Sequence, residues 1–280
     1  MPDPSQSLGG DDDERIDART PRDEIRDLIA TNEGRLGDVY RLLQENLTPE
    51  QIAERLDVAT QSFVYSYRYQ IDAALDGKAT SGAVLRRQAV GALNSLSKRG
   101  RGVLSPDALR LLQANMSAVE GAGVATDPAA EAEADIQEEE STALTLAELA
   151  GVSGIYAFSY GWYLESLVDP NRENTLIKVG QAVDVAARIR QHSSGARTHM
   201  PEPLALIRVY ATGTRSPVDV EHTFHELLES AGHFNPRRTG KSSREVGKEW
   251  FLTNEDFLDS IAKALSLRTL YIGQSEFAGE

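Results

Sequence analysis

The sequence predicts an α+β protein, with an all-α N-terminal module followed by a C-terminal domain built from strands and helices. Three observations predict this class. Apolar residues recur at helical spacing through residues 21–119, and an acidic Ala/Glu-rich stretch follows at 120–145. Short apolar and β-branched runs, bounded by glycine, then mark strands. We therefore predict a helical module at 21–119, an acidic linker at 120–145 and a C-terminal domain at 146–280.

The composition is that of a globular protein with unevenly distributed charge. With 280 residues the chain can form one to two domains that each bury a core. Its net charge of −14 arises mainly from residues 1–24, with 8 acids against 3 bases, and 120–150, with 9 acids and no base. The negative total therefore leaves room for a locally basic groove.

Several classes of site and location can be set aside. The absence of cysteine excludes disulfides, thiolate nucleophiles and cysteine-ligated zinc. No apolar run approaches the length of a membrane span, and the N-terminus lacks the basic start and apolar core of a signal peptide. We therefore expect a cytoplasmic protein with no membrane partner.

The N-terminal module follows an acidic tail. Residues 1–20 lack periodic apolar residues, and we expect them to be disordered. From Pro21 onward, Ile25, Leu28 and Ile29 follow the i, i+3, i+4 spacing of a helix that buries one face.

Residues 48–76 resemble a helix-turn-helix. Thr48 is a candidate N-cap, Pro49 fits the first helical position, and Gln51 completes a capping box. A short helix to Leu56 should precede a tight turn and a second helix. The polar residues that open this second helix are candidate DNA contacts: Thr60, Gln61 and Ser62. A two-helix corner that touches no DNA explains the pattern equally well, and both interpretations stay open.

Basic residues gather farther along the module, and the linker that follows is acidic. The basic candidates for contacts with phosphates or with an acidic protein partner are Arg86, Arg87, Lys98, Arg99 and Arg101. Charge runs are more often a solvated face, but the neighbouring helix-turn-helix pattern favours function. The stretch at 120–145 has no clear apolar face and should be flexible or a solvated helix.

The C-terminal domain is organised around residues 154–188. Gly-Ile-Tyr at 154–156 begins a strand, Lys-Val-Gly at 178–180 closes a second one after a long hairpin connection, and a helix begins at once. Three polar groups lie on consecutive elements of this unit: Tyr156, Lys178 and Arg188. A phenol, an ammonium and a guanidinium so arranged can hold a phosphodiester.

These two tripeptides resemble the paired strand motifs of the GIY-YIG nuclease superfamily. Arg188, eight residues after Gly180, matches the family's essential arginine, and Glu221 matches its metal-binding glutamate on a later helix. The Glu221 and His225 pair, followed by Glu-Trp-Phe at 249–251, resembles a branch with a Lys-Val/Ile-Gly second motif. That branch is often described as a phage-derived DNA-binding domain. The resemblance covers about residues 152–255.

The resemblance implies a small antiparallel sheet flanked by helices and hydrolysis of DNA phosphodiesters. Glu221 would supply an oxygen ligand for Mg²⁺ or Mn²⁺, and Arg188 would grip the phosphate bidentately. Tyr156 is the candidate general base, and nearby cations should lower its pKa. His192 is the competing base, because the pKa of a free imidazole lies near neutrality. We expect His225 to position the substrate or the helix.

The chain also departs from the family pattern. Lys178 stands where many members carry a second tyrosine, and an insert at 160–174 lengthens the connection between the two strands. Tyr-Ile-Gly at 271–273 repeats the second motif, but too little chain follows it for the arginine helix or the glutamate. A basic loop supplies further candidate DNA contacts: Arg237, Arg238 and Lys241.

We therefore expect a metal-dependent DNA endonuclease acting in restriction, phage defence or DNA repair. Two alternatives remain open. One is a non-catalytic DNA-binding or regulatory protein that retains the nuclease fold, and the other is an effector recruited to a protein partner through residues 21–119. Because such domains make few DNA contacts, cutting both strands would call for a homodimer.

Overall fold

The computed structural model describes residues 19–125, 128–193, 202–238 and 247–277. Its helices are α1 (Pro21–Ala30), α2 (Arg35–Gln44), α3 (Pro49–Arg55), α4 (Ser62–Asp76), α5 (Ala83–Arg99), α6 (Pro106–Ala125), α7 (Pro128–Glu148), α8 (Gly161–Glu165), α9 (Val185–Ser193), α10 (Pro217–Ser230) and α11 (Glu255–Ala264). Its strands are β1 (Gly154–Tyr160), β2 (Thr175–Ala182), β3 (Leu204–Ala211), β4 (Trp250–Thr253) and β5 (Arg268–Phe277).

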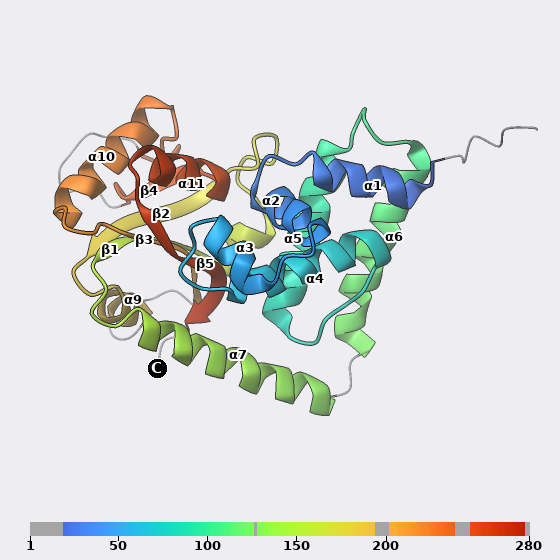
Figure 1. Cartoon of the computed structure of the whole chain (residues 1–280), viewed down its shortest axis with the longest axis horizontal. Helices are drawn as coiled ribbons and strands as arrows, with labels where there is room; N and C mark the ends of the chain where they lie inside the picture. The colour runs from blue at the N-terminus through green and yellow to red at the C-terminus, as the bar shows by residue number, and fades with distance from the viewer. Residues whose placement is uncertain (1–18, 126–127, 194–201, 239–246, 278–280) are drawn as a thin grey trace, which may run out of the picture.

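The molecule has two lobes, and the predicted α+β class is confirmed (Figure 1). Helices α1 to α6 form one lobe, while the sheet and helices α8 to α11 form the other. Helix α7 runs alongside both lobes. Among the described residues, no helix combines the length and apolar character needed to cross a bilayer.

Two helices of the helical lobe, α1 and α3, begin at capping boxes. The Thr48 hydroxyl accepts a bond from the Gln51 backbone N–H at 3.3 Å, and the Gln51 side chain accepts one from the Thr48 N–H at 2.9 Å. The predicted start of α3 is thereby confirmed. Thr20 and Asp23 form a second capping box at the start of α1. Apolar side chains from α1, α4, α5 and α6 then pack into a shared core, including Ile25, Ile29, Ile71, Leu93 and Leu112.

Helices α3 and α4 are joined by a tight turn that lies against the sheet. Asp57 in this turn has a positive φ of 52°. The Ala59 N–H donates to the Thr269 carbonyl on β5 at 3.0 Å, and Val58 bridges the same residue. This contact partly covers the edge of the sheet, where unpaired backbone groups would otherwise be exposed. Whether α4 contacts DNA stays a prediction.

The sheet has the strand order β4-β2-β1-β3-β5, and each neighbouring pair is antiparallel. In the central register, Tyr156 pairs with Gly180 and Phe158 with Lys178. Because side chains alternate along a strand, Tyr156 and Phe158 face α9, while Ile155 packs on the opposite face in a core with α10 and α11. The two candidate motifs therefore share one face.

The stretch predicted as an acidic linker is helical where the structure describes it beyond α6. Residues 128–148 form α7, and its acidic side chains contact α5: Glu131 pairs with Arg86, and Glu138 accepts from the Val84 N–H. Of the two forms predicted for this stretch, residues 128–145 adopt the helix. Part of the linker's negative charge therefore forms contacts with α5.

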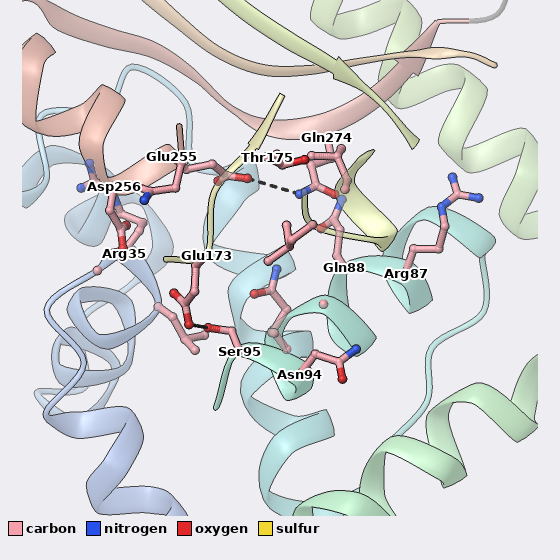
Figure 2. A pocket seen from close by; sticks show the side chains of 18 of the residues that line it. Arg35, Arg87, Gln88, Asn94, Ser95, Glu173, Thr175, Glu255, Asp256 and Gln274 are labelled. Carbon is pink, nitrogen blue, oxygen red and sulfur yellow. Dashed lines mark hydrogen bonds between the residues drawn. The ribbon is translucent and has the colours of Figure 1, made fainter. Parts of the chain in front are cut away.

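The insert at 160–174 joins the two lobes. The Glu173 carboxylate accepts from the Ser95 hydroxyl at 2.7 Å and pairs with Arg99 at 2.6 Å, and Glu165 lies 3.4 Å from Arg87. These contacts border a cavity of about 560 Å³ between the lobes. Figure 2 shows the Ser95–Glu173 bond on one side of this cavity and the Gln274–Glu255 bond on the other.

A candidate phosphodiester site at the β1–β2 pair

The candidate site begins with Tyr156 lying across β2. A Cβ atom placed on Gly180, the residue paired with Tyr156, would lie 2.6 Å from the tyrosine hydroxyl oxygen. Only a residue without a side chain leaves this space open. The glycine at position 180 therefore leaves room for the Tyr156 phenol to reach across β2 toward α9.

Tyr156 meets His192, which stands in the last turn of α9. The Tyr156 hydroxyl oxygen lies 3.0 Å from His192 Nε2. The start of the helix is fixed by Asp184, whose carboxylate accepts from the Ala187 N–H at 2.9 Å. The imidazole ring also packs on Phe158, with centroids 5.1 Å apart. The two candidate bases are therefore within hydrogen-bond distance of each other.

Burial controls the protonation of this pair. It raises the pKa of the Tyr156 phenol, and the Arg188 cation offsets this shift only in part. Burial, together with the charges of Lys178 and Arg188, lowers the pKa of His192 from 6.5 to about 4. Arg188 lowers the pKa of the phenol as expected, but desolvation outweighs this effect and the pKa is raised. At neutral pH the phenol is therefore protonated and the imidazole is neutral.

Lys178 points to the same face, but its charge has a partner. Its ammonium lies 3.1 Å from the Glu249 carboxylate, on the turn that leads into β4. Glu249 also acts electrostatically on Tyr156, His192 and Glu221, so it belongs to the site. In the sequence, this glutamate stood out only as part of the Glu-Trp-Phe motif at 249–251. The pairing of β2 with β4 brings the two residues together.

Glu221 stands on α10 and faces the same cluster. Burial and the neighbouring Glu249 carboxylate raise its pKa, whereas a bond from the Gln181 backbone N–H and the charge of Lys178 lower it. A carboxylate disfavoured in this way is stabilised by a cation, and its oxygens are ligands that Mg²⁺ prefers. Glu221 therefore fits the predicted metal ligand. The described residues contain no group of three or more metal-binding side chains, and Mg²⁺ commonly takes only one or two protein carboxylates.

Arg188 and His225 occupy supporting positions. Arg188 acts electrostatically on both Tyr156 and His192, and it donates to the Gln191 side chain at 2.9 Å. His225 Nε2 lies 3.0 Å from the Val179 carbonyl, and its ring packs on Phe251. This bond fixes α10 to β2, one turn after Glu221.

The predicted DNA contacts lie in three separate places. Gln61 and Ser62 are exposed at the start of α4, while the Thr60 hydroxyl is buried without a hydrogen-bond partner. Of the basic residues around α5, three pair with carboxylates of this chain: Arg86, Arg87 and Arg99. Arg101 is exposed, and Lys98 lines the cavity between the lobes.

The basic loop after α10 contacts the insert that follows β1. Arg237 is exposed and donates to the Tyr163 hydroxyl at 3.5 Å. Arg238 lies 3.5 Å from Glu229, and Lys241 falls outside the described residues. Arg237 therefore connects the loop after α10 to the 160–174 insert.

A comparison with protein families places the site within a known domain type. Residues 155–266 match the model of the T5orf172 domain. This is a phage-associated domain of DNA-binding or nuclease-like type, related to the GIY-YIG fold. The match contains all six candidate residues of the site: Tyr156, Lys178, Arg188, His192, Glu221 and His225. No curated protein and no solved structure matches the chain.

Proposed function

We propose that the protein is a metal-dependent endonuclease that hydrolyses DNA phosphodiester bonds. The observation that carries this proposal is the 3.0 Å contact between a protonated phenol and a neutral imidazole. It lies beside two cations and a half-buried carboxylate that suits a divalent metal. The T5orf172 match supports DNA as the substrate. The phage association of that domain favours restriction or phage defence over DNA repair.

The side chains divide the reaction among them. Arg188 binds the non-bridging oxygens of the scissile phosphate and neutralises their charge. An attacking water passes its proton to the Tyr156 oxygen as Tyr156 passes its own to His192 Nε2, so the phenol need not ionise first. The new oxygen–phosphorus bond forms as the bond to the leaving oxygen breaks, and the leaving oxygen takes up a proton from solvent water. A Mg²⁺ ion held by Glu221 would supply Lewis-acid stabilisation of the phosphate charge.

Cleavage of supercoiled plasmid with Mg²⁺ or Mn²⁺ tests this proposal. We expect nicking or linearisation by the intact chain and its loss in Glu221→Gln and Arg188→Ala. His222→Gln is a matched control, because His222 is exposed on the same helix next to Glu221. Cleavage that survives both substitutions would contradict the assigned site.

A second candidate function is DNA binding without cleavage. Lys178 favours it, because this residue replaces a second phenol and its charge is already paired with Glu249. In that case the intact chain would bind DNA with strong salt dependence but leave plasmid uncut with either metal. Binding that persists in Glu221→Gln and weakens in Arg237→Ala would support this function.

The helical lobe could then select DNA or a protein partner. Gln61 and Ser62 lie on an open surface of α4, together with the exposed residues Tyr65 and Tyr69. Salt-dependent DNA binding that falls in a Gln61→Ala/Ser62→Ala variant would favour DNA. Unchanged DNA binding would favour a protein partner.

A further inference from the structure

Four aromatic side chains form a connected group on the face of the sheet that carries Tyr156. Two come from β1 and β4, and two from the short helix α8 in the 160–174 insert; we call them the aromatic ladder: Tyr160, Trp162, Tyr163 and Trp250. Tyr160 and Trp250 stack with centroids 5.6 Å apart. Trp162 continues the ladder from Tyr160 at 6.3 Å, and Tyr163 lies 5.8 Å from Trp162.

The ladder is continuous with the candidate catalytic residues. Phe158 stacks on Tyr156 at 6.0 Å and meets Trp250 edge-on at 5.7 Å. Positions 156, 158 and 160 share one face of β1 because side chains alternate along a strand. A DNA strand whose phosphate reaches Tyr156 therefore has its neighbouring nucleotides beside the ladder.

The outer end of the ladder is open to solvent and carries a positive charge. Trp162 is 39% exposed, whereas large aromatic side chains usually fill cores. The exposed guanidinium of Arg237 donates to the Tyr163 hydroxyl at 3.5 Å. An exposed ring with partly exposed rings and a cation beside it is a combination that single-stranded nucleic acid binds, through base stacking and phosphate contacts.

We propose that the aromatic ladder stacks unpaired bases next to the scissile phosphate. This inference rests on the proposed function and specifies its substrate class as DNA with a single-stranded or locally opened segment. In an intact duplex the faces of each base are covered by its neighbours, so the rings have no free surface to stack on. The insert, which lengthens the connection between the two strand motifs, supplies Trp162 and Tyr163 for this purpose.

Intrinsic fluorescence tests the proposal directly, because both tryptophans of the chain belong to the ladder. The full chain is titrated, with EDTA and no added metal, with a short single-stranded oligonucleotide and with the corresponding duplex. We expect the single strand to quench tryptophan fluorescence and to bind more tightly than the duplex. Trp162→Ala should weaken single-strand binding by about 10-fold, the effect of losing one stacking ring. Duplex binding should be unchanged, and Trp162→Tyr should keep most of the single-strand affinity.

Ile136→Ala is the control, because Ile136 is 56% exposed on α7, outside the ladder and the predicted DNA contacts, and should have no effect. Equal binding of wild type and Trp162→Ala, or equal quenching by single strand and duplex, would overturn the proposal. If Trp162→Ala does not fold, the wild-type titration decides alone. The plasmid assay is separate: cleavage dependent on Glu221 with no single-strand preference would refute the ladder and leave the nuclease proposal standing.

Discussion

The Tyr156 hydroxyl lies 3.0 Å from His192 Nε2, and burial favours the uncharged form of both groups. The two residues are 36 positions apart and come from a central strand and a flanking helix. A protonated phenol bonded to a neutral imidazole can take up one proton while releasing another. In the proposed reaction, this contact supports a shared role for Tyr156 and His192 in place of a single base.

Removing the Tyr156 hydroxyl should reduce cleavage without unfolding the protein. Tyr156→Phe keeps the ring that stacks on Phe158 and deletes only the proton-transfer group. We expect a loss of at least about 100-fold in the cleavage rate, the usual scale for one acid–base group. Tyr271→Phe is the control, because it deletes another buried hydroxyl, bonded to Ser275 on β5. Equal rates for the two variants would contradict the role of Tyr156.

His192 should make stability depend on pH. Its pKa falls from 6.5 to about 4 on folding, so the unfolded chain binds the proton first as the solution is acidified. The stabilisation that the neutral ring provides is complete above 6.5 and is lost progressively toward 4. Between about pH 7 and pH 5, wild type should lose on the order of 1 kcal/mol more unfolding free energy than His192→Gln, allowing for partial solvent screening. Urea unfolding at both pH values measures this, and parallel pH dependence would argue against the shift.

Gly180 should not tolerate a side chain. The methyl group of Gly180→Ala would collide with the Tyr156 hydroxyl and push the phenol away from His192. We expect a stability loss of about 1–3 kcal/mol together with loss of cleavage. Gly91→Ala is the matched control, because a Cβ there meets nothing within 4 Å and alanine favours the helix. A Gly180→Ala protein with wild-type cleavage would refute the close approach.

Local patterns in the sequence predicted much of the fold. The Thr48–Gln51 capping box and the helical spacing from Ile25 to Ile29 depend on residues three or four apart, and both are present in the structure. The two motif strands were recognisable in the sequence, and the structure adds their register, in which Tyr156 pairs with Gly180. Such features could be predicted because their physical cause lies within one or two turns, or within a known motif.

Features set by distant partners could not be predicted. The charge runs around α5 looked like a phosphate-binding surface, but Arg87 and Arg99 pair with Glu276 and Glu173, far along the chain. Nothing near Glu173 in the sequence marks it as a contact between lobes. The direction of the Tyr156 pKa shift could not be predicted from the sequence either, because burial contributes more to it than the neighbouring charges do.

Arg208 is the clearest case, and it yields a final prediction. This arginine on β3 is fully buried, donates to Asp259 at 3.1 Å and to the Ile207 carbonyl at 2.9 Å, and lies 2.8 Å from Glu255. Arg208→Met would leave the Asp259 carboxylate buried without its main partner. We expect a loss of about 3–5 kcal/mol in unfolding free energy.

The double variant Arg208→Met/Asp259→Leu measures how much of this loss depends on the interaction between the two side chains. The second substitution removes the Asp259 carboxylate that Arg208→Met leaves unpaired, but Arg35 and Tyr210 lose a partner with it. The double variant should therefore recover part of the stability that Arg208→Met alone loses. Urea denaturation of the full chain measures both. If the second substitution adds its own cost to the first, the two side chains act independently, and the buried ion pair does not hold α11 against β3.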